Sequence, residues 1–185
     1  SREIGLYATS YNLFYNPTAS ALGVVQPVFF SASSRVADDG QRIERGYRSL
    51  LAFVSALVLP AFVVVAVMAE PFIALLYGPQ WQAAAALCRP IALAMPLFML
   101  WGLTTPLLWV AGKASREFMI QLPLALLWAA VCLAASRESV EAVAWSVFAL
   151  SFLRCTVVVV TAMRLRQMPW SSLWAGLRGG VALTL

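Results

Sequence analysis

The side chain with the clearest capacity for chemistry is an arginine inside an apolar segment. Arg154 lies between Ala142 and Met163, a run that holds no other charged residue. It precedes Arg164, which follows the end of this run, by ten residues. In a helix this spacing places Arg154 about 15 Å from that end of the span, near the middle of the bilayer. A guanidinium there is costly unless it meets an anion, a carboxylate or water. Three interpretations stay open: contact with a substrate phosphate, a structural pair with a carboxylate elsewhere in a longer chain, or a different position of the span.

A second polar group lies on one face of the apolar segment over residues 4–34. At about 100° per residue, Asn12 and Asn16 share an arc with small and polar residues, and tyrosines lie beside them. Lipid would leave that face unsolvated, so it either lines a wet cavity or packs closely against other helices. The candidate substrate-contacting or cavity-lining residues are Tyr11, Asn12, Tyr15, Asn16 and Arg154.

The residue types needed for metal binding or covalent catalysis are sparse. The sequence has no histidine, which removes the commonest general base and metal ligand. Cys88, Cys132 and Cys155 lie in apolar segments without CxxC spacing, so neither a zinc site nor a disulfide is indicated. The net charge of +5 is scattered through short loops, unlike a nucleic-acid-binding face. We therefore expect no catalytic residue, no metal, no cofactor and no nucleic-acid partner.

Long apolar segments must position the candidate residues. Only 11% of the residues are charged, against about 25% in soluble proteins, so a water-soluble fold could not cover its apolar surface. We predict an all-α fold, a polytopic transmembrane helix bundle of about five complete spans plus the start of a sixth. It forms a single transmembrane domain over residues 1–185, which we expect to be a fragment of a longer protein. The predicted spans are residues 4–34, 49–69, 83–111, 118–135 and 142–163, with a partial span at 173–185.

Basic residues alternate between the loops as membrane orientation rules expect. The connections after the first, third and fifth spans carry arginines, with one lysine in the third, whereas the connection after the second carries neither residue type. In the fourth connection, Arg137 is opposed by two glutamates. We therefore place the first, third and fifth connections in the cytoplasm. Arg89, nearer the outer boundary, is expected to extend toward the membrane surface.

Two segments between the spans indicate structure at the membrane surface. Residues 69–81 are too apolar for an ordinary loop and too short to cross on their own. We expect the outer end of the second span to bend at Pro71 and a turn to follow at Gly78 and Pro79. Residues 38–48 have the pattern of a short amphipathic helix that leads into the second span.

Several short motifs follow one another in a fixed order over residues 5–118. They are GLYATSYNLFYNP, VFFSASSRVADDGQRIERGYRSLLAF, LPAF, AEPFIALLYGPQWQAAA and LLWVAGKASREF. They resemble the second half of Wzx-type polysaccharide or oligosaccharide-lipid flippases, also described as lipopolysaccharide biosynthesis proteins. This group is a branch of the multidrug/oligosaccharidyl-lipid/polysaccharide exporter superfamily. The first span departs from the family pattern by having Ser31 after two phenylalanines.

The resemblance implies an alternating-access transporter and not an enzyme. Its expected task is to flip a polyprenyl-pyrophosphate-linked oligosaccharide across the bacterial inner membrane for exopolysaccharide or lipopolysaccharide export. Such a multi-pass protein needs a polar cavity, cationic groups for the pyrophosphate and flexible helices. The candidate residues would provide the polar cavity and the cationic group, and the prolines within the spans would make the helices flexible. Expected partners are the lipid-linked oligosaccharide, membrane lipids, an N-terminal half of the same chain and the polysaccharide polymerase machinery.

Three other classes of protein stay open at this point. A multidrug or cation-coupled exporter of the same superfamily would favour a carboxylate in the cavity, and no predicted span interior contains an acidic residue. A membrane-embedded glycosyl or ligase-type transferase would need an acid, a histidine or a long outer loop. A scaffold without transport activity is the third alternative.

Overall fold

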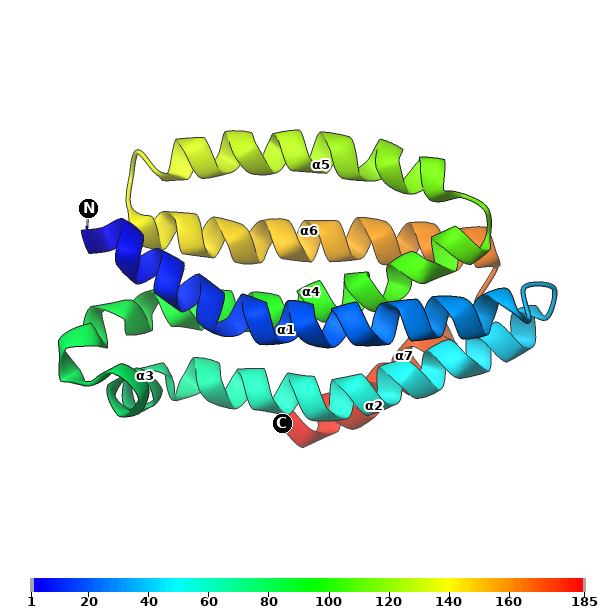
Figure 1. Ribbon diagram of the computed structural model, residues 1–185, viewed down its shortest axis with the longest axis horizontal. Helices are drawn as coiled ribbons and strands as arrows, with labels where there is room; N and C mark the ends of the chain where they lie inside the picture. The colour runs from blue at the N-terminus through cyan, green and yellow to red at the C-terminus, as the bar shows by residue number, and fades with distance from the viewer. Residues whose placement is uncertain (1, 185) are drawn as a thin grey trace.

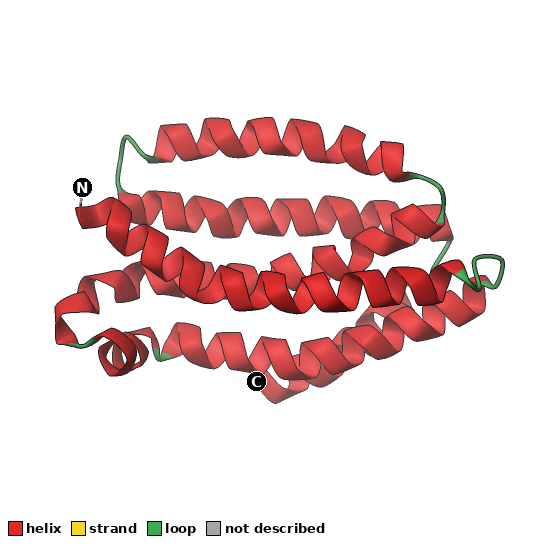
Figure 2. Ribbon diagram, in the orientation of Figure 1, coloured by secondary structure: helices red, strands yellow, loops and turns green. Residues whose placement is uncertain are grey.

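The chain folds into a bundle of helices joined by short connections (Figure 2). The computed structural model describes residues 2–184, and within that range it contains no β-strand, which confirms the all-α class. Five long helices run along the long axis of the molecule (Figure 1): α1 (Arg2–Ser34), α2 (Gly40–Val67), α4 (Ala85–Val110), α5 (Ala114–Ala135) and α6 (Val140–Arg166). The shorter elements are α3 (Ala69–Tyr77), the 3-10 helix η1 (Pro79–Ala84) and α7 (Trp170–Thr184).

Four helical segments are long and apolar enough to cross a membrane. They are α2, η1 together with α4, α5 and α6. Although α1 has 33 residues, it is not among them, because Asn12, Asn16 and Gln26 lower its mean hydropathy. The described part of α7, Trp170–Thr184, has 15 residues, fewer than the about 20 that cross a bilayer core. The predicted total of five spans plus a sixth is thus supported for four segments, and the crossing of α1 and α7 stays a prediction.

Helix α4 occupies the centre of the bundle. It packs against α1, α2 and α6, and it contacts α5 more lightly. Most of its residues are buried, whereas α5 has no buried residue. One apolar cluster surrounds Tyr47 and Leu103, and a second surrounds Phe14 and Ile91. Since α4 contributes to both clusters, the other helices are arranged around it.

The break between α2 and α3 differs from the expected bend. The helices separate at Met68, so the bend expected at Pro71 occurs earlier in the chain. Pro71 instead lies in the first turn of α3, where its missing N–H has no intrahelical partner to lose. Figure 1 shows α3 nearly end-on, so it lies across the bundle axis, as a helix at a membrane surface would. Gly78, with a φ of +87°, ends α3, and η1 begins at Pro79, which confirms the predicted turn.

The segment over residues 38–48 is not a separate amphipathic helix. From Gly40 onward it is the first part of α2, which continues without a break to Val67. Asp39 caps this helix, because its carboxylate accepts a hydrogen bond from the backbone N–H of Arg42 at 2.9 Å. This cap fixes the start of the helix, and the basic residues of the segment lie on its first turns.

The charged connections lie at opposite ends of the bundle. The connections at residues 35–39, 111–113 and 167–169 lie at one end in Figure 1, and α3, η1 and residues 136–139 lie at the other. At the second end, Arg89 forms an ion pair with Glu70 of α3 at 2.8 Å. The basic connections thus share one end, and its assignment to the cytoplasm stays a prediction.

Helix α7 packs closely along α2. The hydroxyl of Ser55 donates a hydrogen bond to the backbone carbonyl of Gly176 at 2.9 Å. A Cβ atom added to Gly176 would lie 2.9 Å from the Cβ of Leu51, and one added to Gly180 would overlap the backbone of Ser55. Two glycines four residues apart therefore let the two backbones approach, as small residues do in membrane helix pairs.

We expect Gly180→Ala to destabilise the protein through this contact. The added methyl group must push α7 away from α2, at a cost of about 1–3 kcal/mol. Gly179→Ala is the matched control, because a Cβ there meets no atom within 4 Å. Thermal unfolding of the detergent-purified full-length protein measures both variants, and equal melting temperatures would contradict the close packing.

The orientation can be tested with two exposed serines at opposite ends of α5. We expect a membrane-impermeant maleimide to label Ser136→Cys and not Ser115→Cys in intact spheroplasts, because the basic end faces the cytoplasm. The background is a variant in which Cys88, Cys132 and Cys155 are replaced by alanine. Permeabilised cells provide the control, since both positions should then react. Labelling of Ser115→Cys alone in spheroplasts would reverse the orientation.

Candidate functional site

Four helices meet around Arg154 and enclose a pocket. Tyr11 and Tyr15 come from α1, Trp101 from α4 and Trp128 from α5, and Arg154 itself lies on α6. We call this space the arginine pocket; its volume is about 380 Å³. Its lining consists of Tyr11, Tyr15, Met95, Phe98, Trp101, Trp128, Val147, Ser151 and Arg154. The structure thus brings three of the five candidate residues together.

The guanidinium of Arg154 rests on an aromatic ring and leaves a donor unused. Its Cζ atom lies 4.0 Å from the centroid of the Trp101 ring, which is a cation–π contact. Among residues 5–184, whose side chains the structure describes, its Nε atom is buried and has no hydrogen-bond partner, and no carboxylate lies within ion-pair distance. The positive charge is therefore held in place without being neutralised by the described part of the chain.

A row of aromatic rings leads from α1 to this arginine. Tyr7, Tyr11 and Tyr15 recur every four residues, so they share one face of α1. The ring centroids of Tyr7 and Tyr11 lie 6.0 Å apart, and those of Tyr11 and Tyr15 lie 5.0 Å apart. Phe98 continues the row, with its centroid 5.3 Å from Tyr15 and 5.3 Å from Trp101. We call these five rings the aromatic row; it ends beneath the guanidinium.

The two asparagines do not line the arginine pocket. Asn12 and Asn16 are exposed on α1 and are absent from the pocket wall. Each follows a pocket tyrosine by one residue, which turns it by about 100° around the helix axis, away from α4 and α6. They therefore lie apart from Arg154, and their predicted role as substrate-contacting or cavity-lining residues is not tested by this pocket. That they face a wet cavity on another side of α1 stays a prediction.

A carboxylate on α5 is engaged by other groups. The indole N–H of Trp109 donates a hydrogen bond to Glu117, and the amide of Gln121 donates a second one at 3.5 Å. The side-chain amide oxygen of Gln121 is buried, with no partner among residues 5–184. Glu117 is thus held near the basic end of the bundle and forms no ion pair with Arg154.

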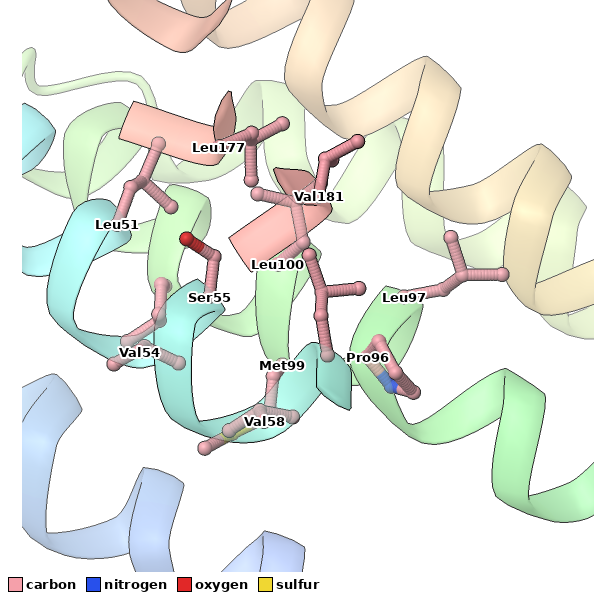
Figure 3. A pocket seen from close by; sticks show the side chains of 12 residues that line it. Leu51, Val54, Ser55, Val58, Pro96, Leu97, Met99, Leu100, Leu177 and Val181 are labelled. Atoms are coloured by element: carbon pink, nitrogen blue, oxygen red, sulfur yellow. The ribbon is translucent and has the colours of Figure 1, made fainter. Parts of the chain in front are cut away.

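A second hollow, between α2, α4 and α7, has the opposite chemistry. Figure 3 shows this apolar groove, which has a volume of about 210 Å³ and leucine, valine, methionine and proline side chains around it. Its one polar lining group, the hydroxyl of Ser55, already donates to Gly176 and to Ala52. The groove therefore offers a polar ligand no free side-chain donor, and the oxygen of this hydroxyl is its one side-chain acceptor.

Sequence reasoning missed the aromatic floor of the arginine pocket. Phe98, Trp101 and Trp128 lie in uninterrupted apolar segments, where nothing distinguishes a pocket residue from one that faces lipid. Of the aromatic residues that line the pocket, only Tyr11 and Tyr15 were among the candidates from the sequence. For a metal ion, the described residues bring together no group of three His, Cys, Asp or Glu side chains.

Known proteins resemble the first part of the chain. Residues 1–86 match the family described as "Polysaccharide biosynthesis protein". The resemblance to polysaccharide biosynthesis proteins is confirmed. The match includes Tyr11 and Tyr15 and ends before Trp101 and Arg154.

A relative from Klebsiella pneumoniae, described as an uncharacterized membrane protein in cps region, agrees with this family. It is 30% identical over 78 residues, and the aligned part covers 42% of this chain and 16% of the relative. The chain thus matches a small part of a much longer protein. No solved structure matches the chain. Together with the four long apolar segments, these findings identify a membrane protein with several transmembrane helices.

The stability of an Arg154→Met variant separates the interpretations of this arginine. If the guanidinium is unpaired, removing its buried donor should gain about 1–3 kcal/mol, offset in part by the lost contact with Trp101. We therefore expect the melting temperature of the full-length protein to rise. A structural pair with a carboxylate would instead make the variant less stable by about 3–5 kcal/mol. Arg164→Met, at an exposed position on the same helix, is the control.

Proposed function

We propose that the full-length protein is a transporter and not an enzyme. It flips a polyprenyl-pyrophosphate-linked oligosaccharide across the bacterial inner membrane by alternating access, for exopolysaccharide or lipopolysaccharide export. The match to polysaccharide biosynthesis proteins and the cps-region relative support a role in polysaccharide export. The arginine pocket supports the class of ligand, because its groups suit binding and not covalent chemistry.

The observation that carries this proposal is the unneutralised charge of Arg154. An arginine within a membrane span is costly to bury, and it persists where it binds a ligand or faces water. Its buried Nε has no partner among the described residues, so a donor remains for an incoming anion. Guanidinium groups bind phosphate oxygens through paired hydrogen bonds. The pyrophosphate of a lipid-linked sugar supplies such oxygens.

The aromatic row suits the sugar part of the same ligand. A pyranose ring has an apolar face of C–H groups and a rim of hydroxyls, so it can stack on an aromatic ring while its hydroxyls bind polar groups. Tyr11 and Tyr15 combine an aromatic face with a phenol hydroxyl in one side chain. The row therefore provides stacking surfaces and hydrogen-bonding groups along one path that ends at Arg154.

The exposed polar face of α1 belongs to the proposed pathway. Asn12 and Asn16 are uncovered in the described residues and would be poorly solvated by lipid. The aligned relative is several times longer than the matched region, so a further part of the same chain would complete a hydrated cavity on this face. Membrane lipids and the polysaccharide polymerase machinery are the other proposed partners.

Transport in proteoliposomes tests the proposal. The full-length protein should transfer a fluorescent polyprenyl-pyrophosphate oligosaccharide across the membrane. Arg154→Ala should slow transfer about 10- to 100-fold, because a charge-assisted hydrogen bond contributes about 1.5–3 kcal/mol. Arg164→Ala, on the exposed end of the same helix, should leave the rate unchanged.

The same assay distinguishes the nearest alternative. Transfer of small cations or dyes by the native protein, without movement of the lipid, would replace the flippase assignment by a multidrug or cation-coupled exporter. Equal rates for native protein and a folded Arg154→Ala variant would remove the arginine from the mechanism while leaving lipid transport in place.

A further inference from the structure

A proline in α4 leaves one backbone carbonyl without its helical partner. Pro106 has no backbone N–H, so the carbonyl of Gly102, four residues earlier, lacks the hydrogen bond that an α-helix would normally give it. Inside a bilayer core, an unpaired carbonyl costs several kcal/mol unless another group satisfies it. The structure supplies that group from a different helix. The side-chain amide of Gln26 on α1 donates to the carbonyl of Gly102 at 2.6 Å.

The backbones of α1 and α4 approach closely at this point. A Cβ atom added to Gly102 would lie 2.7 Å from a methyl group of Leu22. Gly102 is buried, and Gln26 lies one helical turn beyond Leu22 on α1. The absence of a side chain at Gly102 therefore lets the amide of Gln26 reach the backbone directly.

The same stretch of α4 is tied to α2 on another side. The Thr104 hydroxyl donates to the carbonyl of Leu100 at 2.6 Å, so it accepts the hydrogen bond from the Tyr47 hydroxyl at 2.7 Å. Tyr47 and Thr104 are fully buried. Between Leu100 and Pro106, polar bonds thus connect α4 to both α1 and α2, within an apolar cluster.

This tied stretch includes the residue that holds Arg154. Trp101 directly precedes Gly102, and its carbonyl accepts a hydrogen bond from the hydroxyl of Thr105 at 3.0 Å. The position of the Trp101 ring, and of the guanidinium on it, therefore depends on the path of α4 at the break that Pro106 creates. A helix that lacks one hydrogen bond can bend there unless the carbonyl is fixed from outside.

We propose that Gln26 is a positioning residue of the arginine pocket. Its amide replaces the hydrogen bond that Pro106 removes, sets the bend of α4 and so places Trp101 beneath Arg154. The importance of this placement for transport rests on the proposed function, whereas the placement itself does not. Gln26 lies outside the pocket wall, so it acts through α4 and not by contact with a ligand.

A combination of variants in the full-length protein tests this role. Gln26→Leu, Pro106→Ala and the double variant form a cycle, because the Pro106→Ala substitution restores the missing N–H donor. Gln41→Leu is the control, since Gln41 is exposed on the first turn of α2. The protein is labelled with 5-fluorotryptophan, and the Trp101 resonance is assigned by its loss in Trp101→Phe. Arg154→Gln provides the reference signal of Trp101 without a cation above its ring.

We expect Gln26→Leu to lower the melting temperature by about 3 °C in the native background and to have little effect beside Pro106→Ala. Gln26→Leu should also move the fluorine resonance of Trp101 toward that of Arg154→Gln. The other tryptophan resonances and the Gln41→Leu spectrum should stay unchanged. In proteoliposomes, Gln26→Leu should slow lipid transfer about fivefold, a typical size for coupling through a neighbouring helix.

Each deviating result has a separate meaning. Equal loss of stability from Gln26→Leu in both backgrounds would overturn the pairing of Gln26 with the break at Pro106. A destabilised Gln26→Leu variant with an unchanged Trp101 resonance would overturn the positioning role. The melting and fluorine measurements need no substrate. Failure of the native protein to move lipid would therefore count against the proposed function alone.

Discussion

The need to pair every backbone polar group away from water governs this structure. In the bilayer core, water cannot replace a missing helical hydrogen bond, so a break in a helix must be satisfied by protein. The central helix α4 nevertheless carries Pro90, Pro96 and Pro106. At the last of these, the amide of Gln26 supplies the missing donor from α1. The hydrogen bond from Gln26 to Gly102 thus satisfies the backbone of α4 and also joins α4 to α1.

The arginine pocket depends on this central helix. Trp101 comes from α4, and through it the charge of Arg154 on α6 is fixed relative to the tyrosines of α1. A cation held by an aromatic face keeps its charge, because the ring attracts the guanidinium without neutralising it. An ion pair would have given a tighter structure and left less potential for an incoming anion. The packing thus maintains an electrostatic state that suits a binding site.

The main helices could be predicted from the sequence because apolar runs of span length admit few other structures. The sequence predicted the break between α2 and α3 at Pro71, whereas the structure has it at Met68. Proline is tolerated in the first turn of a helix, so its position does not mark a bend reliably. Arg154 and the two pocket tyrosines were also recognisable. The contact between Arg154 and Trp101, and that between Gln26 and Gly102, join helices far apart in sequence. Periodicity within one helix contains no information on such partners.

Helix α5 differs from the others in having no buried residue, and it rests mainly on α6. It nevertheless supplies one wall beside Arg154, through Trp128 and its neighbours Leu124 and Ala125. Substitutions in this wall disturb few packing contacts, so selection for folding constrains them weakly. Substitutions here can therefore change the shape and polarity of the pocket while the arginine and its supporting helix stay the same. Such a division would let one scaffold acquire different ligand preferences through drift in a single helix.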